Sequence, residues 1–458
     1  MRVVELSLAV VMMTGMAVAG SVETPSESEV VEVERPSPVE IFGQSRTFYI
    51  DRTYDGSIVN NRNSLNTGGY IGLKSNDYNG FTAAVAAYGV YGFNIHSDDA
   101  KSLGSASYDP SLYGGEFDNY AFIGQLYINY KMNNTNIKIG RQRLDTPMAG
   151  ADDARMLPNL FEAALLSNTD IENTTLILAH VYRETVGTFG NVYGTAGGLS
   201  LQSGYGLGYK LATSGEFVNM GTVALGDADA DGNPVDNETA GVTALAAIYA
   251  DGGFKLQAWD YIAWDILNAL YLQADYTLPM GDGMKIKLSA QYINETDIGD
   301  TLAGKVDSNY VAAKITGIMG NFSAYVAYST TGSNDDTVTN GGILTPWGGM
   351  PAFTQGMVTR HQFFAGTDTF KVAATYNFAE YGLKASVYYA SFDVGAENTY
   401  INGKSWTTTE PGFDLQYKVA SVDGLNLRFR GNFPDEFGSK EGEAFNWSEY
   451  RFIVNYNF

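Results

Sequence analysis

Hydrophobic and polar residues alternate along most of this chain, most clearly over its last nine residues. Tyr450, Phe452, Val454, Tyr456 and Phe458 take every second position, and mostly polar residues lie between them. Successive side chains of a β-strand point to opposite faces, so this pattern predicts a strand with one apolar and one polar face. The pattern recurs many times upstream. It therefore predicts a transmembrane antiparallel β-barrel, with the apolar face toward lipid and the polar face toward a water-filled lumen.

The alternating segments are joined by two kinds of connection. Short connections rich in Asn, Asp and Gly, such as 76–79 and 281–283, are typical of tight hairpin turns, whereas 92–119, 186–238, 332–368 and 434–447 are long and polar. In outer-membrane barrels the periplasmic turns are short and the extracellular loops are long, so the two kinds of connection fit such a barrel. Counting back from Phe458 gives eighteen strands, and sixteen is also compatible with the pattern. They lie near 446–458, 424–433, 411–420, 381–393, 369–379, 321–331, 308–319, 284–296, 267–279, 254–265, 239–250, 174–185, 161–170, 135–144, 120–131, 80–91, 67–75 and 46–55.

Alternation also sorts the charged residues of these strands. Arg428, Arg430, Arg451, Lys371 and Lys384 all occupy the polar face of their segments. A lysine or arginine facing lipid at mid-membrane costs about 2–4 kcal/mol. We therefore expect these five cations to face the lumen, where a pore of sixteen to eighteen strands leaves an aqueous channel.

The composition narrows the function classes. The mean hydropathy is −0.14 and no run of about 18 apolar residues follows the N-terminal segment, which excludes helical membrane spans. Cys is absent, so disulfides and thiolate metal sites are excluded. The net charge of −23 argues against a nucleic-acid partner. The three histidines lie in no hydrolase-like motif and no phosphate-binding fingerprint is convincing, so we do not expect an enzyme.

The N-terminal region predicts export. Residues 1–19 combine Arg2, an apolar stretch from Leu6 to Val18 and a small-residue cleavage pattern, as in a secretory signal peptide. Residues 20–44 are acidic and contain proline, which predicts a flexible periplasmic lead before a barrel over 45–458. Export together with strand alternation predicts the outer membrane of a Gram-negative bacterium.

One segment carries a sharper motif. The stretch from Ile137 runs through Gly-Arg-Gln to Asp145-Thr-Pro147, and then into Arg155-Met-Leu-Pro-Asn-Leu-Phe-Glu162. It resembles the third-loop region of OprD-type porins, and the trimeric major outer-membrane porins are a close alternative. The resemblance implies a third loop that folds into the lumen and narrows it, facing a ladder of basic side chains. It places Asp145, Asp152, Asp153 and Arg155 at the constriction, and Arg428, Arg430 and Arg451 in the ladder. Arg141 and Arg143 share the parity of the apolar Ile137 and Ile139, which predicts the lipid side unless the strand has ended or bulges there.

A second motif predicts a metal site. Residues 227–238 match the Ca²⁺-binding loop pattern D-x-[DN]-x-[DN]-G-x₅-E completely, although the flanking segments do not look helical. An acidic, solvated loop tip is the alternative interpretation. The predicted Ca²⁺ ligands are Asp227, Asp229, Asp231, Asn233 and Glu238.

These patterns together predict an outer-membrane porin that lets small hydrophilic solutes and ions diffuse through a charged constriction. A channel selective for carboxylates or basic amino acids is the alternative within transport, and a surface adhesin or structural barrel is the alternative from another class. The expected partners are outer-membrane lipid and lipopolysaccharide, and two further copies of the chain in a homotrimer. The resemblance also implies that the barrel-assembly machinery recognises the terminal strand through Phe458.

Overall fold

The structure is a computed structural model, and it describes residues 39–55, 61–93, 95, 107–192, 211–228, 233–438 and 446–458. None of the helices in these residues is long and apolar enough to cross a membrane. The predicted signal peptide lies outside the described residues.

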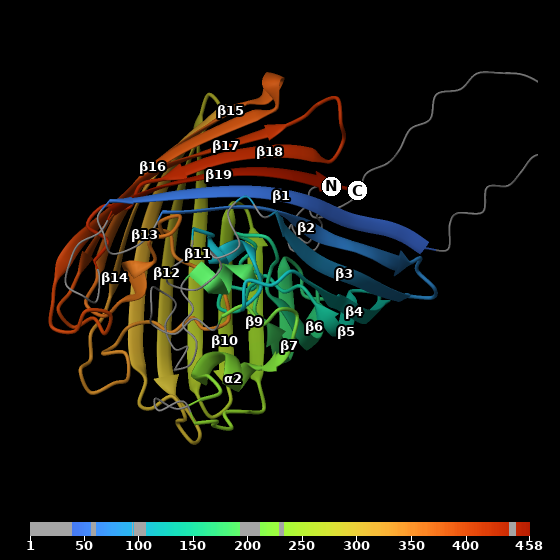
Figure 1. The fold of residues 1–458 in the computed structure, drawn as a ribbon, viewed down its shortest axis with the longest axis horizontal. Coiled ribbons are helices and arrows are strands. Elements are labelled where there is room, and N and C mark those ends of the chain that lie inside the picture. The colour runs from blue at the N-terminus through green and yellow to red at the C-terminus, as the bar shows by residue number, and fades with distance from the viewer. Residues whose placement is uncertain are drawn as a thin grey trace, which may run out of the picture.

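The described chain forms one closed antiparallel sheet (Figure 1). Its wall strands are β1 (Val39–Asp55), β2 (Arg62–Ser75), β3 (Phe81–Phe93), β4 (Tyr120–Met132), β5 (Thr135–Gln142), β6 (Leu160–Asn168), β7 (Thr174–Thr185), β9 (Val242–Asp251), β10 (Phe254–Ala263), β11 (Leu267–Gly281), β12 (Met284–Asp297), β13 (Asp307–Met319), β14 (Phe322–Thr331), β15 (Asp368–Phe378), β16 (Leu383–Val394), β17 (Trp406–Lys418), β18 (Leu425–Asn432) and β19 (Asn446–Asn457). Each wall strand pairs with its neighbour in the chain, and β1 pairs with β19 to close the barrel. β8 (Val218–Asn219) pairs only with the extracellular end of β7, so the wall of the described chain has the eighteen strands that the sequence predicts.

Helical structure is confined to short segments of the described connections. They are η3 (Pro110–Leu112), η4 (Thr188–Val192), α2 (Met220–Leu225), η5 (His361–Phe363) and η6 (Ala379–Tyr381).

The two faces of the wall follow the alternation of the sequence. Large apolar side chains such as Ile128 and Ile139 face outward and remain 61% and 57% exposed, as expected for residues that contact lipid. Their neighbours along the strands face the lumen. The hairpin turns at one end are tight, and Asn79, Asn133 and Asp282 have the positive φ values that Asn and Asp tolerate in turns.

The barrel begins earlier than the sequence predicted. Residues 39–44, which we expected in the flexible lead, belong to β1 and pair with β2. Val39 and Ile41 continue the outward apolar pattern, and Glu40 lies 3.9 Å from Lys74 across the pair. Phe458 exchanges backbone hydrogen bonds with Gly43, so the last residue lies at the seam that closes the barrel.

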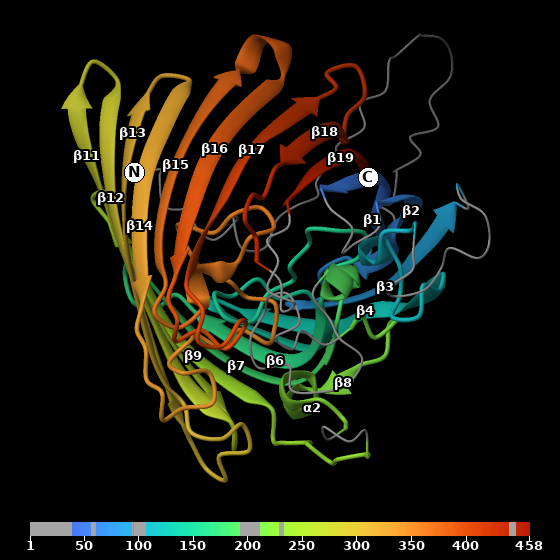
Figure 2. The ribbon, with the colours of Figure 1, turned by 60° about the vertical axis from the view of Figure 1, so that its left-hand side comes forward.

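Two extracellular connections fold into the barrel (Figure 2). We call residues 143–159 loop L3 and residues 332–367 loop L7. L3 reaches across the lumen, because Arg46 of β1 contacts one part of it and the hydroxyl of Tyr261 in β10 accepts a hydrogen bond from the backbone N–H of Met148 in another. Side chains of both loops and of α2 form one buried apolar cluster with the inner face of β7 and β9–β13. The third loop therefore enters the lumen as predicted, but L7 shares that position.

Candidate functional site: the channel constriction

Loop L3 is anchored to the wall through Asp153. The Arg46 guanidinium donates to both carboxylate oxygens of Asp153, with Nη1–Oδ1 2.6 Å and Nη2–Oδ2 3.3 Å, and Nη1 also donates to the backbone carbonyl of Arg155. Arg143 Nη1 donates to Asp153 Oδ2 at 3.0 Å, and Arg143 Nε donates to Asp145 at 2.9 Å. Burial by itself would raise the pKa of Asp153, but the two guanidinium groups outweigh burial and hold that pKa below its ordinary value.

L3 and L7 bind each other inside the barrel. Ala149 forms isolated β-bridges with Trp347 and its neighbour, and the Gly150 N–H donates to the Trp347 carbonyl at 3.0 Å. The Arg360 guanidinium of L7 donates to both oxygens of Asp152 in L3, at 3.2 and 3.3 Å. Because backbone and ionic contacts both join the loops, L3 and L7 act as one structural unit across the lumen.

A buried carboxylate of the wall holds the other side of L7. Glu410 of β17 accepts hydrogen bonds from the backbone N–H groups of residues 357–359, including Thr359 at 2.7 Å, and from the Tyr388 hydroxyl. Lys371 of β15 donates to the Gln355 carbonyl in the same part of L7. A carboxylate that accepts several backbone N–H groups makes strong, directional bonds, so this wall sets the position of L7.

A second buried group, Glu449 of β19, gathers three arginines. Arg52 Nε donates to it at 2.7 Å, Arg155 Nη2 lies 3.6 Å away, and Arg451 also pairs with it. Asp109 lies 3.1 Å from Arg52 and brings a second carboxylate to the cluster. Glu449, Arg155 and Arg451 are all at most 1% exposed. This cluster therefore fastens L3 to β1 and β19 instead of presenting charge to solutes.

The remaining ladder cations lie on the wall beside this cluster, because Arg430 of β18 is the register partner of Arg451 in β19. Arg428 is 34% exposed and pairs with Asp414 through Nε at 2.8 Å and through Nη2. Arg430 lies 3.5 Å from the same carboxylate and is more buried. Lys371 and Lys384 share the lumen-facing side of their strands, and Lys384 is exposed. Over this wall, cations outnumber carboxylates.

Arg141 and Arg143 separate at the end of β5. Arg141 points to the outer face, as its parity predicts, and its Nε donates to Glu162 at 2.9 Å. β5 ends at Gln142, so Arg143 already belongs to L3 and turns toward Asp145 and Asp153.

All four residues predicted at the constriction lie in L3, with different exposures. The Asp145 side chain is 51% exposed, Asp153 is 20% exposed, and Arg155 is fully buried. Sequence reasoning did not single out the groups that hold the loops, which are Arg46, Arg52, Arg360, Glu410 and Glu449. Arg46, Arg52, Glu410 and Glu449 do follow strand alternation, and a charged residue on the wet face is the signal that could have found them. Arg360 lies in an irregular loop, where no periodicity applies.

The predicted Ca²⁺ loop is only partly described. Asp229 and Asp231 lie outside the described residues. Asp227, Asn233 and Glu238 are described, and the Val235 N–H donates to the Asp227 carbonyl at 2.9 Å, which closes the loop at its base. Among the described residues no three His, Asp or Glu side chains are placed to hold a metal ion. The Ca²⁺ site stays a prediction.

Comparison with known proteins assigns the chain to a family. A family model described as outer membrane porin, OprD family, matches residues 40–188 and 207–458. The chain belongs to the OprD family. No similar sequence is found among curated proteins.

Solved structures of OprD-family porins share the fold. OccAB3 of Acinetobacter baumannii is 17% identical, with a TM-score of 0.72 over 92% of this chain and 99% of that one. OpdK of Pseudomonas aeruginosa, solved with vanillate, is 16% identical, with a TM-score of 0.70 over 92% and 98% of the chains. OccK9 (OpdG) of the same organism is 19% identical, with a TM-score of 0.70 over 92% and 98%. This OprD-family chain is therefore an outer-membrane porin of a Gram-negative bacterium, and its relatives are channels, not enzymes.

Proposed function

We propose that this porin selects small anionic solutes, carboxylates in particular, as they pass the unit formed by L3 and L7. The observation that carries the proposal is the charge of the wall from β15 to β18. Lys371, Lys384, Arg428 and Arg430 lie on its lumen face against only two carboxylates, Asp414 and Glu410. Glu410 is fully buried against L7, so the charge that a solute meets is positive. A positive wall raises the local concentration of anions in a narrow aqueous path.

The chain as a whole is acidic, with a net charge of −23, and the proposal depends on where the charges lie. In a narrow pore the nearest groups dominate, because charges more than about 8–10 Å away are largely screened at physiological ionic strength. Two relatives of known structure support the chemistry. The structure of OpdK contains vanillate and that of OccK2 contains glucuronate, and both compounds are carboxylates.

Bilayer recordings test the proposal. The wild-type channel should give a reversal potential that favours anions in a salt gradient, and Arg428→Gln with Arg430→Gln should shift it toward cations. Asp414→Asn is the matched control with the opposite sign, because it removes a carboxylate from the same wall and should shift selectivity further toward anions. Unchanged reversal potentials in both variants would show that this wall does not select.

Liposome swelling with solutes of similar size separates the alternatives. Faster entry of glucuronate than of glucose supports the proposed selectivity, and equal rates indicate a general diffusion porin. Faster entry of arginine than of glucuronate would favour basic amino acids as solutes, and would point to the exposed Asp145 as their contact.

We further propose that the porin assembles as a homotrimer and that its terminal strand is recognised by the barrel-assembly machinery. Trimerisation rests on the resemblance to trimeric porins, and the mass of the detergent-solubilised complex by light scattering tests it. The proposal for assembly is supported by Phe458, which is 39% exposed at the closing seam. Deletion of Phe458 should lower the amount of folded barrel in the outer membrane, measured as the heat-modifiable band on gels.

The match of residues 227–238 to a Ca²⁺ loop supports a structural Ca²⁺ ion in the fourth extracellular connection. Calorimetry with Ca²⁺ should give a binding heat for the wild type that is lost in Asp229→Ala. Equal heats for the two proteins would refute the site.

A further inference from the structure

The outer face of the wall carries an unusual pair of cations. Among the lysines and arginines in the wall strands of the described chain, Arg141 of β5 and Arg183 of β7 are the two that lie on the outer face. In the sheet Arg141 lies opposite Leu126 of β4 on one side and Glu162 of β6 on the other, and Leu126 is 56% exposed on the outer surface. Arg183 lies opposite Glu162, next to a β-bulge at Tyr182 of β7 that leaves both Tyr182 and Arg183 outward. The other cations of these strands follow the lumen-facing parity.

The two arginines form one cluster around a single carboxylate. Arg141 Nε donates to Glu162 Oε1 at 2.9 Å, and Arg183 Nη1 lies 3.7 Å from Glu162 Oε2. The side chains of Arg141 and Arg183 remain 35% and 42% exposed. Arg141 Nη1 also donates to the Ile123 carbonyl at 3.2 Å, and its guanidinium carbon lies 4.2 Å from the centre of the Phe217 ring. Two cations against one carboxylate leave this cluster with an excess positive charge. Cations on the lipid side are costly in hydrocarbon, so a pair retained there calls for an anionic neighbour.

The position of the cluster places it in the outer leaflet. β5 and β6 have only 8 and 9 residues, at or below the roughly 9–11 that a tilted strand needs to cross a membrane. Arg141 and Glu162 stand near the extracellular ends of these strands, and Arg183 stands near the extracellular end of β7. The charged groups thus lie on the side of the membrane where the head groups of the outer leaflet lie.

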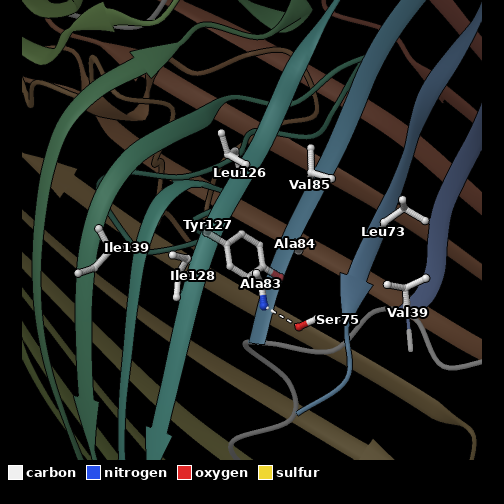
Figure 3. Close-up of a pocket in the computed structure, with 10 residues that line it drawn as sticks. All are labelled: Val39, Leu73, Ser75, Ala83, Ala84, Val85, Leu126, Tyr127, Ile128 and Ile139. Atoms are coloured by element: carbon white, nitrogen blue, oxygen red, sulfur yellow. Dashed lines mark hydrogen bonds between the residues drawn. The ribbon is translucent and has the colours of Figure 1, made fainter. Parts of the chain in front are cut away.

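Apolar hollows continue from the cluster along the outside of the barrel. One hollow of about 740 Å³ has Arg141 and Glu162 at its margin and is lined mainly by apolar and small residues of β4–β7. A second hollow, shown in Figure 3, shares Leu126 and Ile139 with the first and reaches Leu73 and Val39 near the periplasmic end. The wall is hollowed here because the outward positions of Ala83 and Ala164 carry small side chains. A positive group above a continuous apolar groove fits an amphipathic anion.

We propose that this face of β4–β7 binds a phosphorylated lipid of the outer leaflet, the lipid A part of lipopolysaccharide. A lipid phosphate would receive charge-assisted hydrogen bonds from Arg141 and Arg183, and one or more acyl chains would lie in the two hollows. Charge complementarity favours this occupant over an apolar protein surface, because a phosphate offers acceptor oxygens to both guanidinium groups. The proposal does not depend on which solutes the channel passes.

Native mass spectrometry of the full-length porin extracted from outer membranes in mild detergent tests the site. Loss of two charge-assisted contacts in Arg141→Gln with Arg183→Gln should reduce bound lipid A roughly tenfold or more. Lys131→Gln with Lys138→Gln is the matched control, because it removes two charges from the lumen face of the adjoining strands β4 and β5. The control should retain lipid A, and Arg141→Lys with Arg183→Lys should retain part of it.

A second measurement uses delipidated porin, with lipid A carrying two, one or no phosphates as the probe. Affinity should fall with each phosphate removed, and the fall should be absent in the glutamine double variant. Equal lipid A in wild type and double variant, or equal affinity for the three probes, would overturn the proposal. If the glutamine double variant keeps its lipid A but no longer has the mass of the wild-type oligomer, this face of β4–β7 is a contact between subunits and the proposal is wrong. Normal heat-modifiability and conductance of the variant exclude misfolding as the cause.

Discussion

Replacing Glu449 by glutamine should destabilise the barrel more than any other single isosteric change in the lumen wall. The carboxylate is fully buried and contacts Arg52, Arg155 and Arg451. At an effective dielectric constant near 20, charges 2.7–3.6 Å apart attract by roughly 5–6 kcal/mol per pair, and desolvation offsets much of this. In Glu449→Gln, Asp109 would be the one carboxylate of this cluster left beside three buried guanidinium groups. Removing one partner of a buried ion pair is expected to lower the free energy of unfolding by about 3–5 kcal/mol.

Urea unfolding in phospholipid vesicles, followed by tryptophan fluorescence, measures this free energy of unfolding. The expected loss corresponds to roughly two to three and a half orders of magnitude in the folding equilibrium constant. Glu40→Gln is the control, because its pair with Lys74 is 3.9 Å long and more than 40% exposed on both sides, and should contribute less than about 1 kcal/mol. A loss below about 1 kcal/mol in Glu449→Gln would refute the view that this cluster fastens L3. Single-channel recordings should also show more current noise, because Arg155 of L3 loses its anchor.

Three further predictions concern the inward loops. His361 of L7 is buried, which lowers its pKa to about 4, and its Nε2 lies 3.1 Å from the Phe437 carbonyl. Because the unfolded pKa is about 6.5, the unfolded chain binds the proton first, and unfolding free energy should fall by about 2 kcal/mol between pH 7 and pH 5. The pKa of Asp153 is held low, so its ion pair with Arg46 persists above pH 4 and weakens only as the pH falls further, when current noise from L3 should rise. Glu410→Gln should release the backbone of L7 and produce long-lived conductance substates in single-channel recordings.

Each of these predictions has a variant that isolates its cause. His361→Gln should remove most of the stability change between pH 7 and pH 5, and an unchanged pH dependence would assign that change to other groups. Asp153→Asn should already be noisy at pH 7 and insensitive to acid, whereas a wild-type-like trace would mean that Asp153 does not hold L3. Thr375→Ala is the control for Glu410→Gln, because it alters the lumen face of β15 at a hydrogen bond to Ser386. If Thr375→Ala also produces conductance substates, these substates are not caused by the loss of the Glu410 contacts with L7.

The resemblance to OprD-type porins was sound because it rested on a local motif. The stretch from Ile137 to Glu162 keeps its strand, its loop and its next strand in one continuous segment, so the motif can be recognised in the sequence. The position of the loop is set by distant residues such as Arg46 and Arg360. The ladder residues were harder to place. Alternation put Arg451 on the lumen face together with Arg428, and both lie there. Arg451 is nevertheless buried within the Glu449 cluster, whereas Arg428 is about one third exposed. Parity decides the face of a strand, but it carries no information on what folds over that face.

The sequence by itself determined the barrel and its lipid-facing and lumen-facing sides, and of the two strand numbers that it allowed, the structure has eighteen and not sixteen. Strand pairing follows chain order, and lipid penalises a polar residue on the wrong face at every second position, so local patterns suffice. The tertiary structure decided the constriction. L7 joins L3 through contacts between residues some two hundred positions apart, such as Asp152 with Arg360, and no periodicity links such positions. Only the closed barrel brings these loops, the buried carboxylates of β17 and β19, and the outward cluster of Arg141 and Arg183 to their partners.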